Sequence, residues 1–440
     1  MGLRKRIWAT ALLELQVYRA VWSVCWPFVR WFVRVKDRKR LVPALIANER
    51  TGVATSKDKF RDHPHGIVWI HGASVGECLS ALPLIKFLTH ESGRPTTLPT
   101  YNVLLTTTTP SARQLLNQRL QSNPKAMCIF APLDHVTCVN RFLDTWCPSA
   151  AIWIESEIWP NLIAETASRQ VPMAILNGRM SIQSFDRWNS WFLRWFAQFL
   201  LSQFRLVLCQ SPEDLRRFQS LGQADAKYLG DLKFVADKAT IDPADLLQLQ
   251  NAIGSRVLWV AASTHEGEED IMLATHVQLL SSHPDALLVL IPRHPHRVPA
   301  IIRELSAQYP HLKTTTRTQD QVPSADSNVF IVDTMGETQL YYEAASVVFV
   351  GGSLVPIGGH NILEPLRSGC TVLHGPHMTN FTSVVQTLQS PDVVQVSSSS
   401  LLSTLRTSLD SPSRPFATGN QSLAPIQDAL WANVTRFLTG

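Results

Sequence analysis

Short runs of β-branched and other apolar residues alternate with longer segments of helical periodicity along most of the chain. Ten of these runs, of three to five residues each, predict buried strands and fall into two sets of five. Strands of this length with helices between them are typical of parallel sheets covered on both faces. The pattern therefore predicts an α/β fold with two Rossmann-like, doubly wound domains. The first set is Ile67–Ile70, Val103–Thr107, Ala151–Ile154, Met173–Leu176 and Leu206–Cys209, and the second is Val257–Ala261, Leu287–Ile291, Val329–Val332, Val347–Val350 and Thr371–Leu373.

Shifts in composition place the boundaries of the domains. A polar stretch without periodicity precedes the first strand, and Asp237–Arg256 is the expected hinge between the two sets of strands. The helix Ile426–Phe437 is a candidate to pack on the first domain. Open α/β sheets bind ligands outside the carboxyl ends of their strands, so we expect the active site in a cleft between the domains. The predicted parts are a linker at 41–65, a first Rossmann-like domain at 66–236, a second Rossmann-like domain at 237–415, and a C-terminal helix at 416–440.

Residues 1–40 are rich in tryptophan, phenylalanine and basic side chains. Their longest run without a charge, Ala20–Val29, has ten residues, whereas a helix that spans a membrane needs about twenty. The pattern predicts an anchoring helix in the plane of an anionic membrane, kinked or ended at Pro27. A mitochondrial transit peptide and a core helix of the first domain are the alternatives. The basic residues expected within an arc of about 60° of a helical wheel are Lys5, Arg19, Arg30 and Arg34.

Composition narrows the classes of protein that fit. The 440 residues are 45% hydrophobic and 17% charged, which excludes a disordered chain or a coiled coil. Ten basic and two acidic residues give residues 1–40 a net charge of +8, so the other residues carry −3 of the total of +5. We therefore expect no nucleic-acid partner, because phosphate binding needs a basic excess. The seven cysteines form no C-x-x-C pair and the histidines no H-E-x-x-H site, so we expect reduced, buried thiols and no metal.

Three S/T-x-x-E motifs follow predicted strands: Ser74–Glu77, Ser263–Glu266 and Thr334–Glu337. Each lies at a carboxyl end, where open α/β sheets bind ligands. Each also fits a helix capping box, in which the glutamate only returns a hydrogen bond to the backbone. The G-x-G-x-x-G, P-loop and D-x-D signatures are absent, so a catalyst here has to stabilise a phosphate leaving group without the usual metal clamp.

Two further strand ends suit an anion. Gly351–Ser353 and Gly358–Asn361 form a glycine-rich turn, in which backbone amides and a helix N-terminus can approach a phosphate. Glu364, one turn into that helix, can accept hydrogen bonds from ribose hydroxyls. Arg293, within Pro292–Pro295, can bind a phosphate with two nitrogens. An ordinary αβ turn and a solvated loop arginine are the alternatives.

The segment Trp153–Asn161 carries a carboxylate, Glu155, directly after a buried strand. Burial of a carboxylate costs free energy unless the group is paired. Lys233, near the predicted cleft, is a candidate partner. The alternative is a structural ion pair, which would itself stabilise the fold poorly.

Taken together, these motifs resemble the 3-deoxy-D-manno-octulosonic acid (Kdo) transferases of lipopolysaccharide and lipid A biosynthesis, a GT-B glycosyltransferase family. The resemblance covers residues 66 to about 385. It implies a metal-independent, inverting transfer of Kdo from CMP-Kdo, without a cofactor, to a lipid A precursor (lipid IVA), with release of CMP. The family's membrane-bound N-terminus agrees with the predicted anchor. The matching stretches are Ser74–Glu77, Glu155–Asn161, Asn177–Ser181, Leu232–Phe234, Ser263–Glu269, Pro292–His296, Val332–Glu337, Gly351–Ser353, Gly358–Glu364 and Gly375–His377.

The resemblance also implies roles for individual residues. Glu77 would be the base that takes the acceptor proton, and Glu155 and Lys233 would stabilise the transition state. The sequence departs from the family pattern where Ile362 replaces a frequent proline and where an aspartate after Lys233 comes late. A basic-aromatic stretch expected before the first strand is not recognisable in 41–65. The residues implied to hold CMP are Pro292, Arg293, Met335, Gly336, Glu337, Asn361, Ile362, Leu363 and Glu364.

The sequence thus predicts a membrane-associated Kdo transferase, at the cytoplasmic face of a bacterial inner membrane or, in a eukaryote, in the mitochondrion. Another GT-B transferase with a different nucleotide sugar is one alternative, and a non-catalytic membrane-tethered nucleotide-binding protein is the other. No catalytic candidate precedes Glu77, so we expect the chemistry to survive removal of residues 1–40.

Overall fold

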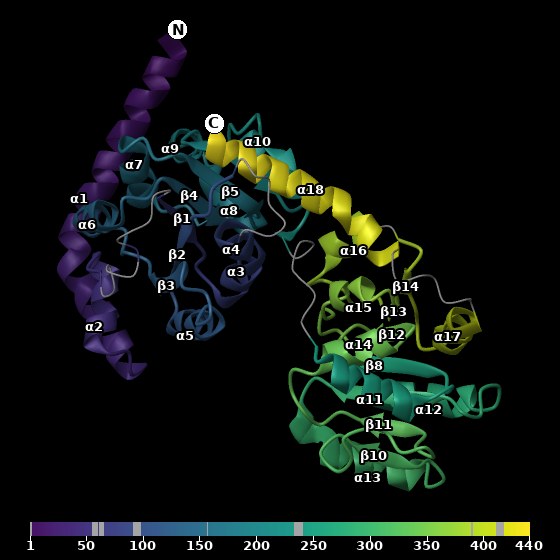
Figure 1. Cartoon of the computed structure of the whole chain (residues 1–440). Coiled ribbons are helices and arrows are strands. Elements are labelled where there is room, and N and C mark those ends of the chain that lie inside the picture. The colour runs from purple at the N-terminus through teal and green to yellow at the C-terminus, as the bar shows by residue number, and fades with distance from the viewer. Residues whose placement is uncertain are drawn as a thin grey trace. The chain divides into compact units, whose positions relative to one another are not determined.

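The chain divides into two compact units, which Figure 1 shows in a computed structural model. Unit 1 comprises Met1–Ala236 and Ile426–Gly440, and unit 2 comprises Asp237–Pro425. Within the described residues, each unit contains one parallel seven-stranded sheet, so the predicted α/β fold with two parallel sheets is confirmed. The structure describes residues 2–54, 60, 66–90, 98–155, 157–232, 241–388, 390–410 and 418–440.

The sheet of unit 1 has the strand order β3-β2-β1-β4-β5-β6-β7. The order reverses between β1 and β4, and such a reversal opens a crevice at the carboxyl ends of the two strands. The sequence predictions missed β3 and β7, because β3 contains a single β-branched residue, Ile129, and β7 has only two residues. The strands are β1 (Ile67–His71), β2 (Asn102–Thr107), β3 (Ala126–Phe130), β4 (Ala150–Ile154), β5 (Met173–Gly178), β6 (Phe204–Cys209) and β7 (Lys227–Tyr228).

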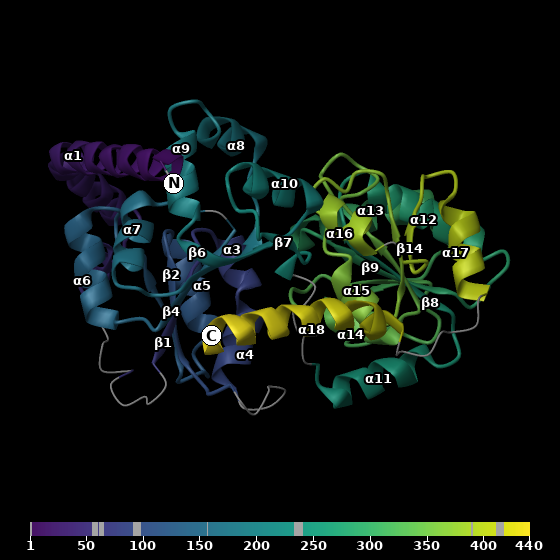
Figure 2. The same ribbon diagram turned by 90° about the horizontal axis from the view of Figure 1, so that it is seen from above.

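Helices cover both faces of this sheet (Figure 2). Along β1, Val68 and Ile70 face the core under α3, α4 and α5, and Trp69 faces the core under α6, α7 and α9. The C-terminal helix joins the first of these faces, where Trp431 stacks on Phe87 with ring centroids 4.2 Å apart. The helices are α1 (Gly2–Lys39), α2 (Ala44–Ala47), η1 (Asn48–Thr51), α3 (Val75–Ser80), α4 (Leu82–Thr89), α5 (Pro110–Arg119), α6 (Val136–Trp146), α7 (Pro160–Ser168), α8 (Ile182–Trp188), α9 (Arg194–Leu201), α10 (Pro212–Ser220) and, from Ile426 on, α18 (Thr418–Thr439).

Helix α1 packs on unit 1 along one side. Ala11 and Leu15 are buried in the core of the unit, and Arg19 forms an ion pair with Glu165 of α7. Arg19 was predicted as part of a basic stripe that faces an anionic membrane, but its guanidinium is paired with a carboxylate of this chain. The helix also continues through Pro27 to Lys39 instead of ending there.

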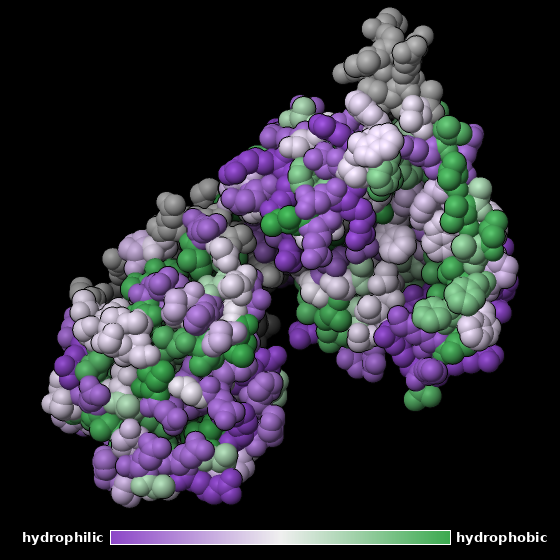
Figure 3. All heavy atoms as spheres, turned by 180° about the vertical axis from the view of Figure 1, so that it is seen from behind, coloured by the Kyte–Doolittle hydropathy of each residue, from purple (hydrophilic) through white to green (hydrophobic). Residues whose placement is uncertain are grey.

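The opposite side of α1 is apolar and exposed, as the run of hydrophobic side chains along the helix in Figure 3 shows. None of the described helices combines the length and the apolar character that crossing a bilayer requires. The exposed apolar residues of α1 are Leu12, Leu13, Val17, Val21, Val24, Phe28, Trp31 and Phe32.

The first part of the expected linker is packed onto unit 1. Glu49 and Arg50 lie in η1 and are both buried. Glu49 accepts hydrogen bonds from Arg113 and from the backbone amide of Phe130, and Arg50 donates to Asp37 at the end of α1 (3.0 Å). These two charged residues therefore fasten 48–51 to the sheet and to α1.

The sheet of unit 2 has the order β10-β11-β9-β8-β12-β13-β14 and reverses between β8 and β12. The sequence predictions missed β10 and β14, which are three-residue strands with polar residues. The strands are β8 (Leu258–Thr264), β9 (Leu287–Pro292), β10 (Thr314–Thr316), β11 (Val329–Ile331), β12 (Val347–Val350), β13 (Thr371–His374) and β14 (Val393–Gln395), and the helices are α11 (Pro243–Ile253), α12 (Glu268–Leu279), η4 (Pro295–Arg297), α13 (Val298–Gln308), α14 (Thr338–Ala344), α15 (Leu363–Arg367), α16 (Thr382–Leu388) and α17 (Leu401–Asp410).

Candidate functional site

Glu77 lies in the first turn of α3, just beyond the carboxyl end of β1, and is 8% exposed. Its carboxylate accepts hydrogen bonds from the backbone amides of Ala73 (2.8 Å) and Ser74 (3.2 Å), and Ser74 caps the Glu77 amide in return. The predicted capping box is therefore confirmed here. A carboxylate has about four acceptor sites, so these bonds leave room for a substrate hydroxyl.

The other two S/T-x-x-E motifs are not capping boxes, and those predictions are wrong. At Ser263–Glu266 the helix begins later, at Glu268, after Gly267 adopts a left-handed conformation with φ +90°. At Thr334–Glu337 the hydroxyl of Thr334 donates to the carboxylate of Glu337 instead of capping a backbone amide. The motif alone does not fix where a helix starts, because the backbone of the intervening residues decides it.

Glu155 directly follows β4, the neighbour of β1, and its backbone is left-handed with φ +65°. Asn177, at the end of β5, is also left-handed with φ +57°. Its side-chain oxygen accepts a hydrogen bond from the Leu232 amide (3.0 Å). Non-glycine residues in this region are strained and gather at functional sites. Lys233, the predicted partner of Glu155, and Ser156 lie outside the described residues.

A cavity of about 290 Å³ lies on the same edge of the sheet as Glu77. Ala73, whose amide binds Glu77, lines it together with His71 at the end of β1. Glu157 and Trp159, from the loop between β4 and α7, form another part of its wall. Both residues belong to the segment Trp153–Asn161, but no sequence pattern predicted a role for either of them.

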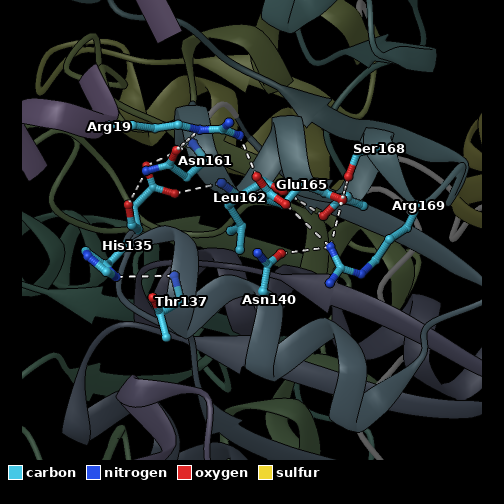
Figure 4. Close-up of polar contacts among 11 residues, drawn as sticks. Arg19, His135, Thr137, Asn140, Asn161, Leu162, Glu165, Ser168 and Arg169 are labelled. Atoms are coloured by element: carbon cyan, nitrogen blue, oxygen red, sulfur yellow. Dashed lines mark hydrogen bonds and ion pairs between the residues drawn. The ribbon is translucent and has the colours of Figure 1, made fainter. Parts of the chain in front are cut away.

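Asp134 lines this cavity and is hydrogen-bonded to Tyr18 of α1. Its carboxylate accepts hydrogen bonds from the Tyr18 hydroxyl (2.8 Å) and from the backbone amides of Asn161 and Leu162 at the start of α7. Burial raises the pKa of Asp134 to about 7, against the effect of these hydrogen bonds. Figure 4 shows the neighbouring contacts, in which Arg19 reaches Asn161. The hydrogen bond between Tyr18 and Asp134 thus joins residues that are 116 positions apart in the sequence.

In unit 2, Arg293 follows β9 and is exposed at the carboxyl edge of the sheet. Its backbone amide donates to the Thr264 carbonyl (3.0 Å), which fixes the turn. The guanidinium has no partner among the described side chains. Pro292, by contrast, is buried as the last residue of β9. Of this predicted pair, the structure presents Arg293 as the group available to an anion.

The glycine-rich turn after β12 is organised by a buried carboxylate, Glu268. Its oxygens accept hydrogen bonds from the backbone amides of Gly352 (2.7 Å), Ser353 (3.0 Å), Leu354 (2.9 Å) and His265 (3.0 Å). Gly351 has no space for a side chain, because a Cβ there would lie 2.4 Å from the Ser263 carbonyl oxygen. No sequence pattern predicted a role for Glu268, because three of its four partners lie 84 to 86 residues further along the chain.

Two histidines meet beside this turn. The Nε2 atoms of His265 and His360 lie 2.8 Å apart, so that one imidazole donates a hydrogen bond to the other. Burial lowers the pKa of both residues, and His294 packs edge-on against His265. The pair therefore offers neutral imidazoles next to the exposed Arg293.

The predicted nucleotide-binding segment Met335–Glu337 follows β11. Met335 is 69% exposed and Gly336 has open space around it. Glu337 accepts hydrogen bonds from Nε and Nη2 of Arg317 (3.0 and 3.1 Å), and this hydrogen bonding lowers the pKa of Glu337. Met335 and Gly336 are thus the accessible part of the segment.

In the segment Asn361–Glu364, only the two ends are accessible. Ile362 and Leu363 are fully buried, so they can reach a ligand through their backbone alone. The Asn361 side chain accepts a hydrogen bond from the Leu363 amide (3.0 Å) and donates to Glu364 (2.9 Å). The three segments that the resemblance implied for CMP thus follow β9, β11 and β12 of the unit 2 sheet.

The sequence and fold of the chain can be compared with those of known proteins. Residues 46–236 match the model of the family "3-Deoxy-D-manno-octulosonic-acid transferase (kdotransferase)". The chain is 34% identical over 379 residues to the 3-deoxy-D-manno-octulosonic acid transferase of Rickettsia felis, which covers 86% of this chain and 78% of that protein. The chain belongs to this family. It is therefore a glycosyltransferase, as the resemblance had implied.

A plant relative and a solved structure extend the comparison. The Arabidopsis thaliana protein "Probable 3-deoxy-D-manno-octulosonic acid transferase, mitochondrial" is 33% identical over 79% of this chain and 77% of its own length. UDP-GlcNAc 2-epimerase from Neisseria meningitidis matches with a TM-score of 0.51 at 12% identity, over 83% of this chain and 99% of that one. At this identity the epimerase shows the fold alone, which is the GT-B-like type with two parallel sheets.

Proposed function

We propose that this glycosyltransferase moves Kdo from CMP-Kdo to a hydroxyl of a lipid A precursor, lipid IVA, with inversion and release of CMP. The observation that carries the proposal is the 34% identity to the Rickettsia felis transferase over 86% of the chain. The aligned region is longer than either unit, so it includes residues of both. The different strand-end chemistries of the two units support it, because the reaction needs a base and an anion-binding site.

In the proposed reaction, Glu77 takes the proton of the acceptor hydroxyl. The oxygen then bonds to the anomeric carbon of Kdo, the bond from that carbon to the phosphate oxygen breaks, and its electron pair leaves with CMP. Glu77 suits this role because its backbone bonds hold the carboxylate in place at the carboxyl end of β1, as a general base requires. Glu155 and Lys233 are proposed to stabilise the charge that develops.

Unit 2 is the proposed site of the nucleotide. Arg293 would pair with the phosphate of CMP, because its guanidinium is exposed and has no partner among the described side chains. Preorganised donors stabilise a leaving phosphate without a metal. The full proposed set is Pro292, Arg293, Met335, Gly336, Glu337, Asn361, Ile362, Leu363 and Glu364.

We also propose that α1 lies on an anionic membrane, either the cytoplasmic face of a bacterial inner membrane or an organellar one. The exposed apolar side of the helix supports this, and Arg30 and Arg34 are exposed next to it. A helix with an apolar side and basic residues binds in the plane of such a surface. Trp191 and Phe192 before α9, which packs on α1, add further exposed aromatic area.

A donor panel tests the proposed reaction. The full-length protein is incubated in detergent with lipid IVA and either CMP-Kdo or UDP-sugars, and the products are identified by mass spectrometry. We expect addition of Kdo from CMP-Kdo only. Transfer from a UDP-sugar alone would instead establish the alternative nucleotide sugar, and CMP binding without any transfer would favour the non-catalytic alternative.

A further inference from the structure

The cavity beside Glu77 has the size and shape of a small ligand site. Its volume of about 290 Å³ is at the low end for ligand pockets, which suits one sugar ring and not a whole lipid. It is bounded by strand ends on one side and by the loop before α7 on the other. The six lining residues that matter for binding are Arg50, His71, Ala73, Asp134, Glu157 and Trp159.

The cavity adjoins the proposed base. Ala73 lines the cavity, and its backbone amide donates a hydrogen bond to the Glu77 carboxylate (2.8 Å). Glu157 lies close enough for the charge of Glu77 to add to the effect of burial, and both raise the pKa of Glu157. The Glu77 carboxylate is therefore hydrogen-bonded to a residue of the cavity wall.

Two polar groups in the cavity wall have unused hydrogen-bonding capacity. The Trp159 indole nitrogen donates to one oxygen of Glu157 (2.8 Å), and the other oxygen has no partner among the described residues. His71 is fully buried, and its Nδ1 contacts Thr106 Oγ1 (3.0 Å), but its Nε2 has no partner in the described part of the chain. Nε2 is closed to a group the size of water, so the second Glu157 oxygen is the acceptor that a ligand hydroxyl can reach.

The charges around the cavity favour a neutral ligand over a phosphate. Arg50 is held by Asp37 (3.0 Å), and its guanidinium lies over the ring of Phe130, 3.8 Å from the centroid. Its positive charge is thus already balanced by the aspartate. The carboxyl with an unused oxygen is Glu157, which can accept a hydrogen bond from a hydroxyl. Arg50, the one cation in the described lining, is already paired, so a phosphate would have no free counter-charge there.

We propose that this cavity binds the sugar ring that carries the attacked hydroxyl of the acceptor, with Glu157 hydrogen-bonding another of its hydroxyls and Trp159 packing on its apolar face. This inference rests on the proposed function, and it adds the residues that dock the acceptor. It also gives α1 a second role, because Tyr18 and Asp37 hold Asp134 and Arg50 in the cavity wall.

Steady-state kinetics with full-length protein in detergent test this site. With CMP-Kdo saturating and lipid IVA varied, we expect Glu157→Gln to raise the acceptor KM about tenfold, the effect of a hydrogen bond to a charged group. The KM for CMP-Kdo should not change. Trp159→Phe, which keeps the ring but loses the indole donor to Glu157, should raise the acceptor KM about threefold. Glu213→Gln, an exposed carboxylate on α10, is the matched control and should leave both KM values unchanged.

The outcomes separate this proposal from the proposed function. An unchanged acceptor KM in both the Glu157→Gln and Trp159→Phe proteins, with CMP affinity intact, overturns the cavity as the acceptor site. If the unmodified protein transfers no Kdo, the proposed function fails, and equilibrium binding of lipid IVA in micelles then tests the cavity alone. Weaker binding to Glu157→Gln than to the unmodified protein would support the site, and equal binding would overturn it.

Discussion

The carboxyl edges of the two sheets have the same strand arrangement but opposite chemistry. In unit 1, the carboxyls of Glu77, Glu157 and Asp134 gather at the edge, and burial raises the pKa of the last two. In unit 2, the carboxylates Glu268 and Glu337 are bound by backbone amides and by Arg317. One fold therefore presents hydrogen-bond acceptors on one sheet and donors on the other.

This difference follows from which groups are satisfied within each unit. Four amides converge on Glu268, so that carboxylate shapes the glycine-rich turn and is not available to a ligand. Arg293 has no such partner and stays exposed. A reaction that removes a proton from one substrate and holds the phosphate of another needs both kinds of edge.

The largest expected effect comes from the acceptor edge. Glu77→Gln should lower kcat by about 10²-fold or more, the usual contribution of a general base. The amide retains one acceptor oxygen, so one of the bonds to Ala73 and Ser74 survives and the fold should lose only about 1 kcal/mol. CMP affinity, measured by calorimetry, should not change. Near-normal kcat in a folded Glu77→Gln protein would remove Glu77 from the chemistry.

The next largest effect is on the pH dependence of stability, through the proton of the Asp134 carboxyl. The folded chain keeps the Asp134 proton up to a pKa of about 7, whereas the unfolded chain releases it near 4. This contribution to stability is therefore present at low pH and is lost as the pH rises through 7. From pH 5 to pH 8, we expect the stability of the unmodified protein to fall by about 3 kcal/mol relative to Asp134→Asn. Urea unfolding of both proteins measures this, and parallel pH profiles would contradict it.

At the donor edge, Arg293→Ala should weaken CMP binding about tenfold, as expected for loss of a charge-assisted hydrogen bond. The acceptor KM should stay the same, because Arg293 belongs to unit 2. Arg303→Ala, an exposed arginine on α13, is the matched control. Calorimetry with CMP gives the affinities. A rise in acceptor KM without loss of CMP affinity would reverse the assignment of the two edges.

The smallest effect tests the exposed side of α1. Phe28→Ser should weaken binding to anionic vesicles about fivefold, as half-burial of a phenylalanine contributes about 1 kcal/mol. Activity on detergent-dispersed acceptor should be unchanged, because Phe28 is 67% exposed. Co-sedimentation with vesicles at low and high salt measures the binding. Unaltered binding would show that this side of the helix does not meet the membrane.

The structure also changes one expectation about α1. The sequence offered no catalytic candidate before Glu77, which implied that residues 1–40 could be removed without loss of chemistry. However, Ala11 and Leu15 are part of the core, and Tyr18 and Asp37 hold groups in the cavity wall. A chain that starts near residue 41 is therefore expected to lose stability and acceptor binding.

Local signals explain what the sequence could predict. Glu77, Glu155 and Arg293 each follow an apolar run that forms a strand, so the strand pattern alone puts them at a carboxyl edge. The capping box at Ser74 is equally local, since its partners are three residues apart. Five of the seven cysteines are buried as expected, and Cys25 and Cys147 are exposed.

Long-range contacts explain what the sequence could not predict. Tyr18 reaches Asp134 across 116 positions, and His265 meets His360 across 95. No periodicity or motif links such pairs. The sequence likewise could not predict that Nε2 of His71 lacks a hydrogen-bond partner among the described residues, because this depends on the strands and loops that surround it.

Hydrogen exchange of the full chain, with and without CMP, tests the central claim most directly, namely that the nucleotide binds the donor edge of unit 2. Amides that bind or lie under a phosphate exchange more slowly. We expect slower exchange in peptides that cover 334–337 and 352–364, and unchanged exchange in peptides that cover 72–77 and 157–162. Protection of the unit 1 peptides alone would contradict the account.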